Sequence, residues 1–155
     1  MIRPLTEGET ALAREAFGEH LECGTVRFLA APWPFNRAFV PGRWFGRDWI
    51  VWPRRNAADD LSAGAFGVQA VLVHELVHIW QAQQGVNLLL AKLKAGDDRA
   101  AYVYPMDHCQ WRHLNIEQQA SAVEHAFRLS RGGAVPGDAA FYRAVAPFPC
   151  GLNRI

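Results

Sequence analysis

The sequence predicts an α+β fold in which a small antiparallel sheet packs on helices, and three observations support this prediction. Short segments rich in β-branched and aromatic residues occupy the first third of the chain. A long apolar segment of helical length follows at 65–84, and a second segment after Asn115 has apolar residues at helical spacing. Strands that are followed by a run of helices are typical of α+β proteins.

Length and composition are consistent with one domain over 1–155, because 155 residues can bury one core but not two ordinary ones. A formal net charge of +1 leaves no broad basic face for a phosphate backbone, so a nucleic-acid partner is not expected. The first residues carry charge where a signal peptide needs an apolar run, and no apolar stretch is long enough for a bilayer. These features predict a cytoplasmic protein without a membrane partner, and the oligomeric state stays open.

The first half of the chain contains one predicted helix and three predicted strands. Thr6 and Glu9 fit a capping box, apolar residues follow at helical spacing, and Gly18 ends the helix. Three segments with strand-like composition come next, at 25–30, 38–40 and 48–52. The turn signal Pro41-Gly42 separates the second strand from the third, which indicates antiparallel pairing.

The second half is predicted to be mainly helical. Residues 65–84 are apolar on nearly every side, which is typical of a buried helix, and residues 88–94 continue as helix. An extended segment is expected at 101–104. Asn115 can cap a further helix that ends at Gly132-Gly133, and a short helix is expected at 138–144.

A metal-binding motif, His74-Glu75-Leu76-Val77-His78, lies within the predicted buried helix. Positions i and i+4 share one helix face, so both imidazoles can reach one zinc ion, with Glu75 beside the ligands. Burying an unpaired carboxylate is costly, and a cation would offset that cost. The alternative, two hydrogen-bonded core histidines and a coincidental glutamate, is less compatible with this spacing.

Catalytic zinc requires a third protein ligand and an open position for water. A histidine six residues after His78 would supply it, but that position is Gln84. Glu117 and Glu124 lie seven residues apart, on nearly one face of the helix that follows Asn115. Either glutamate could therefore reach the metal.

The order of a His-Glu-x-x-His helix, a loop and a helix with Glu-x-x-Ala, which residues 117–120 match, resembles the gluzincin metallopeptidases. The resemblance implies a minimal zincin-like domain with Glu117 as third ligand. The chain is also similar to small bacterial proteins described as zinc proteases or Vgr-related proteins, and through them to the metalloprotease-like domain found beside contractile injection systems. The segments that carry this similarity are Leu5-Thr6 with Glu9, Ala13 and Phe17-Gly18, then 74–81, 102–104 and 115–120.

One position departs from the gluzincin pattern. Many gluzincins have an aspartate four residues after the glutamate ligand, where it supports a histidine ligand, but this chain has Ser121. Glu124 and Asp107 are the candidates to replace it.

The implied function is a zinc-dependent peptidase that acts on a peptide or protein. Glu75 takes a proton as water attacks an amide carbonyl, and then passes it to the leaving amine. One further donor would stabilise the oxyanion. Tyr104 is the favoured donor, and an extended substrate would pair with the strand at 49–52. The other candidate donors are Tyr102, His113, His125 and Arg128.

Two alternatives stay open. The chain could be a catalytically weak or inactive zinc-stabilised adaptor of an injection system, with export by a specialised secretion system. In that case protein ligands such as His108 or His113 would close the fourth zinc position. The chain could also hydrolyse a non-peptide amide with the same site.

Overall fold

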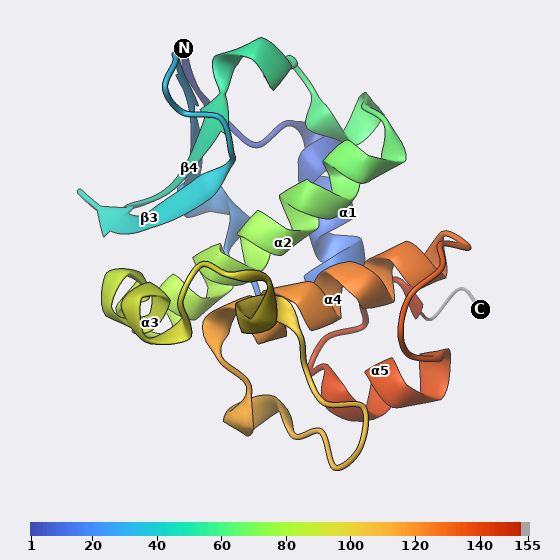
Figure 1. The fold of residues 1–155 in the computed structure, drawn as a ribbon. Helices are drawn as coiled ribbons and strands as arrows, with labels where there is room; N and C mark the ends of the chain where they lie inside the picture. The colour runs from blue at the N-terminus through green and yellow to red at the C-terminus, as the bar shows by residue number, and fades with distance from the viewer. Residues whose placement is uncertain (153–155) are drawn as a thin grey trace.

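Five helices and four strands make up the part of the chain that the computed structural model describes, residues 1–152. The strands and the first helix come first along the chain, and four helices follow (Figure 1). The predicted α+β class is therefore confirmed. The bounds are β1 Ile2–Pro4, α1 Glu7–Phe17, β2 Val26–Ala31, β3 Phe39–Trp44, β4 Arg47–Pro53, α2 Phe66–Gln83, α3 Leu88–Ala95, α4 Ile116–Ser130 and α5 Ala139–Val145.

The sheet is mixed, so the prediction of a wholly antiparallel sheet is wrong. Its strand order is β1-β2-β4-β3, and β2 and β4 pair in parallel at its centre. The outer strands β1 and β3 are antiparallel to their neighbours. Pro41-Gly42 is not the predicted turn, because β3 continues through it with an irregular register and Phe45-Gly46 reverses the chain instead. Proline is tolerated there because β3 is an edge strand.

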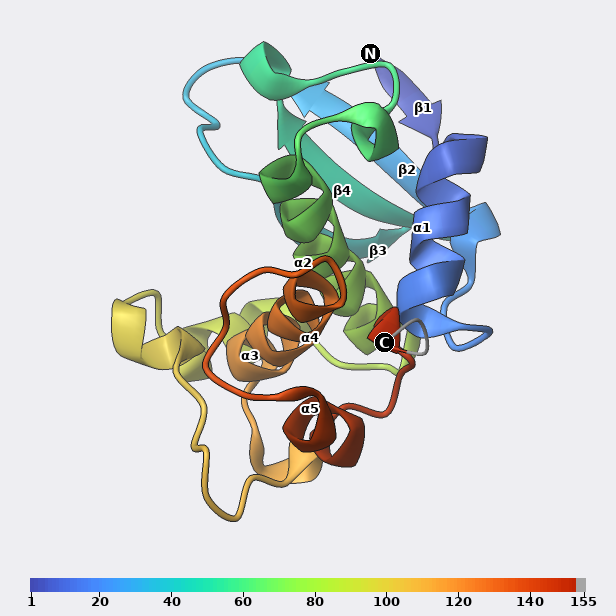
Figure 2. The ribbon, with the colours of Figure 1, turned by 90° about the vertical axis from the view of Figure 1, so that its right-hand side faces the viewer.

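The core lies between the sheet and the helices. Alternate residues of the central strands, such as Val26 and Phe28 in β2 and Ile50 and Trp52 in β4, are buried in it. Figure 2 shows α1 and α2 in front of the sheet, so these helices cover one face of it. Among residues 1–152, no helix combines the length and apolar character that crossing a membrane requires.

The helix α2 runs through the middle of the molecule, with the sheet on one side and α4 on the other (Figure 1). The helix predicted at 65–84 is thus confirmed, and so is the helix that Asn115 caps. The segment at 101–104 is only partly extended, since a 3-10 helix occupies Arg99–Tyr102 and the extended backbone begins at Val103. The next section shows that this turn and the neighbouring α3 border the predicted metal site.

Candidate metal centre

Three predicted ligands converge from two helices. His74 and His78 lie one turn apart on α2, and Glu117 faces them from the first turn of α4. Oε2 of Glu117 lies 3.2 Å from Nε2 of His74 and 3.4 Å from Nε2 of His78. One ligand atom from each residue lies within 4.8 Å of the other two. This separation suits three ligands of a single cation.

Local sequence explains how Glu117 reaches this position. The side chain of Asn115 accepts a hydrogen bond from the backbone N–H of Gln118, and the side chain of Gln118 accepts one from the backbone N–H of Asn115. This capping box starts α4 two residues before Glu117. The partial positive charge of a helix N-terminus also favours a carboxylate in the first turn. The cap therefore both places and stabilises the third ligand.

The other ring nitrogen of each histidine also has a partner. Nδ1 of His74 lies 3.0 Å from Oε2 of Glu124, and Arg128 lies 2.7 Å from the other oxygen of Glu124, Oε1. Nδ1 of His78 lies 2.8 Å from Oε1 of Gln81. A hydrogen bond from Nδ1 leaves the lone pair of Nε2 free for a metal and fixes the ring orientation. Glu124 thus takes the place where many gluzincins have the aspartate that Ser121 replaces here.

The charges of this cluster are strongly coupled. Burial alone would lower the pKa of His74, but hydrogen bonds to Glu117 and Glu124 raise it to about 10. Burial would raise the pKa of Glu117, but hydrogen bonds from His74, His78 and Lys92 hold it far below its usual range. A cation that binds here must therefore displace a proton from His74.

Glu75 has a different environment from the three ligands. Its side chain is buried, and Oε2 has no hydrogen-bond partner among the described residues. Burial raises the pKa of Glu75, while the nearby His78 and His74 act in the opposite direction. A buried carboxylate oxygen without a partner is costly, and this one lies beside the three candidate ligands.

Two cavities meet at Glu75. One of about 530 Å³ lies toward α3 and β3, and the other, of about 500 Å³, lies toward the start of α2. His74, Glu75 and Tyr102 line both of them. An extended molecule could therefore cross the site from one cavity to the other. The apolar residues that line the first cavity are Phe39, Val40, Trp44, Leu88, Leu89 and Ile116.

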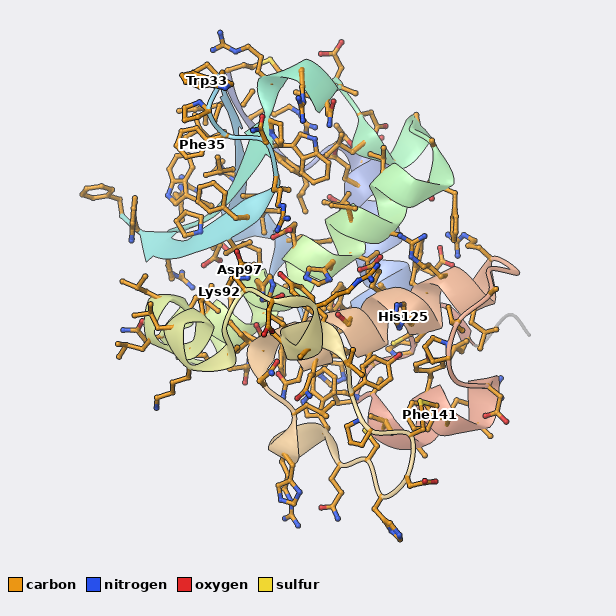
Figure 3. All side chains as sticks on the ribbon, in the orientation of Figure 1. Trp33, Phe35, Lys92, Asp97, His125 and Phe141 are labelled. Atoms are coloured by element: carbon orange, nitrogen blue, oxygen red, sulfur yellow. The ribbon has the colours of Figure 1, made fainter. Side chains whose placement is uncertain are left out.

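Lys92, which the sequence analysis missed, lies in the first cavity on α3 (Figure 3). Its ammonium donates a hydrogen bond to Oε1 of Glu117, the oxygen that does not face the histidines. It also lies 3.3 Å from the hydroxyl of Tyr102 and 3.4 Å from a carboxylate oxygen of Asp97. Burial would lower the pKa of Lys92, but the bond to Glu117 raises it above its usual range.

Tyr104, the favoured oxyanion donor, does not reach the site. Its hydroxyl lies 2.6 Å from Nδ1 of His125 and 2.8 Å from the hydroxyl of Tyr142, in a buried network between α4 and α5. Its ring stacks on Phe141, which Figure 3 labels on α5. Tyr104 lines neither cavity that contains Glu75, whereas Tyr102 lines both. The 3-10 helix at Arg99–Tyr102 explains the difference, because it turns Tyr102 rather than Tyr104 toward His74.

The strand predicted to pair with an extended substrate is not available for pairing, because it lies inside the sheet. Residues 49–52 belong to β4, which has β2 on one side and β3 on the other and therefore no free edge. The free edge near the site is β3, whose residues Phe39, Val40 and Trp44 line the first cavity. Order in a sheet depends on pairing between distant segments, which local composition does not reveal.

These features define a class of protein: a small α+β fold whose central helix carries a His-Glu-x-x-His motif, which forms a candidate metal site with a glutamate from a second helix. No model of a known protein family matches the chain. The chain is 29% identical to the type VI secretion system spike protein VgrG2b of Pseudomonas aeruginosa, in an alignment that is 165 residues long. The match covers 96% of this chain but only 15% of the spike protein.

A solved structure from the same spike protein is also similar to this chain. The effector domain of Pseudomonas aeruginosa VgrG2b superposes with a TM-score of 0.70 at 27% sequence identity. The match covers 92% of this chain and 80% of that domain. Sequence and structure together support homology to a Vgr-type effector domain. This agrees with the predicted resemblance to Vgr-related proteins of injection systems.

Proposed function

We propose that this chain is a zinc-dependent hydrolase of gluzincin type that cleaves a peptide or protein as an effector of a type VI secretion system. One observation carries the proposal. A carboxylate oxygen of Glu75 that has no hydrogen-bond partner within residues 1–152 lies beside the His74, His78 and Glu117 donors, where two cavities meet. This is the arrangement that water activation needs: a metal site, a base and space for substrate on both sides.

The donor set favours zinc. Two imidazole nitrogens and one carboxylate oxygen are typical of catalytic zinc sites that keep a position for water. A purely structural site would be closed by a fourth protein ligand. His108 and His113, the candidates for that role, are not in the donor group found among residues 1–152, and neither lines the two cavities. This supports an open position.

The chemistry follows from the residues around the site. When bound, zinc supplies Lewis acidity, which polarises a carbonyl group and lowers the pKa of a neighbouring water. Glu75 accepts the proton that this water releases, and burial, which raises the pKa of Glu75, favours its protonated form. Glu75 then donates the proton to the leaving amine. Tyr102 lines both cavities and donates a hydrogen bond to the oxygen on which negative charge develops.

The comparisons support the delivery route. The relatives are named as a spike protein and as its effector domain, so we propose that this chain acts with a Vgr-type spike. It would be made in the cytoplasm and leave through the secretion system. The apolar lining of the first cavity and the free edge of β3 suit an extended peptide.

A second candidate is a zinc-stabilised module without turnover. The names of the relatives refer to a spike and an effector, which fits an adaptor as well as an enzyme. The ligands join α2 to α4, so the metal could serve only to fasten these helices together.

The substitution Glu75→Gln separates the two candidates. Wild type and variant are loaded with zinc, their metal content is measured, and cleavage of a peptide mixture is followed by mass spectrometry. The hydrolase predicts at least a ~100-fold lower rate for Glu75→Gln at unchanged zinc content. Glu19→Gln removes an exposed carboxylate and should cleave like wild type. Equal rates in wild type and Glu75→Gln would reject the hydrolase, and zinc binding without cleavage in any variant would favour the module.

A further inference from the structure

Lys92 divides the two oxygens of Glu117 between two partners. Oε2 faces Nε2 of His74 and of His78, whereas Oε1 accepts the hydrogen bond from the Lys92 ammonium. Glu117 is only 2% exposed, so water has little access to either oxygen. The two ends of this carboxylate thus have fixed and different roles.

We propose that Lys92 is a positioning residue that restricts Glu117 to a single metal-binding oxygen and thereby keeps the fourth metal position open. The inference rests on the metal site of the proposed function. It concerns the geometry of that site rather than the reaction, and nothing in the His-Glu-x-x-His or Glu-x-x-Ala motifs requires a lysine here.

The need for such a residue follows from carboxylate chemistry. A carboxylate can bind a cation through one oxygen or through both. Binding through both oxygens of Glu117 would occupy the space that an attacking water needs. A hydrogen bond between charged groups is roughly twice as strong as a neutral one, so the Lys92 ammonium is well suited to retain Oε1.

Lys92 is itself held in place by the segment that follows α3. The ammonium lies 5.5 Å from the centre of the Tyr102 ring, close to its hydroxyl, and Asp97 contacts it from the loop. Figure 3 shows the labelled Lys92 and Asp97 next to each other above α3. A lysine whose only role was to keep the surface soluble would not need these contacts with Tyr102 and Asp97.

The competing explanation is that Lys92 only neutralises the charge of Glu117. It predicts the opposite change in metal affinity when Lys92 is removed. If Lys92 only neutralises Glu117, its ammonium repels an incoming cation, and removing it should leave metal affinity unchanged or make it tighter. If Lys92 positions Glu117, its removal should weaken binding and allow both carboxylate oxygens to bind.

The test compares Lys92→Met with Lys94→Met, which removes a lysine from the exposed side of the same helix. Zinc affinity is measured by competition with a chromophoric chelator, and Co²⁺ replaces zinc as a probe whose visible absorption weakens as the coordination number rises. For Lys92→Met we expect about 10- to 100-fold weaker zinc binding and weaker cobalt bands. Lys94→Met should match wild type, and Lys92→Arg should recover part of the affinity because it restores the donor.

Lys92→Met with wild-type or tighter zinc affinity and an unchanged cobalt spectrum would overturn the inference. Lys92→Ala, which also removes the donor and favours the helix, serves the same purpose if the methionine variant does not fold. None of these measurements depends on turnover. If Glu75→Gln does not change cleavage but Lys92→Met still weakens zinc binding, only the hydrolase is rejected. If Glu75→Gln lowers cleavage but Lys92→Met leaves zinc binding and the cobalt spectrum unchanged, only the role of Lys92 is rejected.

Discussion

Each of the three candidate metal ligands has a second partner of its own. Glu124 binds His74, Gln81 binds His78 and Lys92 binds Glu117. These second contacts fix rotamers and tautomers, and they are what makes a preformed metal site precise. Glu75 is the exception, since one of its oxygens has no partner among residues 1–152. The contrast matches the proposed roles, in which three side chains hold an ion and Glu75 exchanges a proton.

Sequence spacing predicted the two histidines, the gluzincin resemblance selected Glu117, and Glu124 was one of two candidates to support a histidine, but the partners Gln81 and Lys92 were not predicted. The pattern His74-Glu75-x-x-His78 depends only on helix geometry, so it can be found without a structure. The structure confirms that Glu117, which the gluzincin resemblance selected, lies with the two histidines. Lys92 lies 25 residues from Glu117 along the chain, and no local pattern links a lysine to a distant glutamate.

The two tyrosines near this region should respond differently to the loss of the hydroxyl. We predict that Tyr102→Phe lowers kcat by about 100-fold with little change in KM, because a donor to the developing negative charge acts mainly in the transition state. Tyr104→Phe should leave kcat unchanged and lower the free energy of unfolding by about 1 kcal/mol, because its hydroxyl bonds to His125 and Tyr142, away from the candidate site. Steady-state kinetics and denaturant unfolding of both variants check this. A loss of kcat in Tyr104→Phe alone would contradict the placement of both residues.

At the scale of elements, helices were easier to predict than the arrangement of strands. The capping boxes of α1 and α4 and the continuous apolar run of α2 are local signals, and the structure confirms all three helices. The strand at 48–52 was also found, but its central position in the sheet and its parallel pairing with β2 were not. The three-residue β1 at Ile2–Pro4 was missed, because so short a segment carries no alternation.

The capping box of α4 should matter for metal binding as well as for stability. Asn115 caps α4, and its side-chain amide also donates to the carbonyl of Ala101, next to Tyr102. We predict that Asn115→Ala lowers the free energy of unfolding by about 1 kcal/mol and weakens zinc binding about tenfold, because Glu117 lies in the turn that loses its cap. Unfolding curves and chelator competition measure the two effects.

Thr6 offers a matched control, because it forms the same kind of capping box at the start of α1, away from the site. Thr6→Ala should cost a similar free energy of unfolding and leave zinc affinity unchanged. If both variants lowered zinc affinity equally, the effect would reflect general destabilisation rather than the position of Glu117.

At the scale of the whole molecule, the metal site joins two layers. Its histidines come from α2, which packs on the sheet, and its glutamate comes from α4, which packs on α5. The buried charges of the site are balanced by hydrogen bonds among His74, Glu117 and Lys92. The fold itself therefore need not depend on the metal, whereas its stability should, since a bound ion would connect α2 to α4 directly.

Zinc should accordingly raise the melting temperature without being required for folding. A ligand that binds only the folded state at 100 times its Kd adds about 2.7 kcal/mol, or roughly 5–10 °C for a domain of this size. Differential scanning fluorimetry with added zinc or chelator measures this shift, and circular dichroism reports whether the metal-free chain keeps its helices. His78→Ala should abolish the zinc-dependent increase, whereas His20→Ala, which removes an exposed histidine after α1, should retain it. A metal-free chain without helical structure would contradict the prediction, because it would show that the hydrogen bonds of Lys92 and the histidines cannot hold α2 and α4 together.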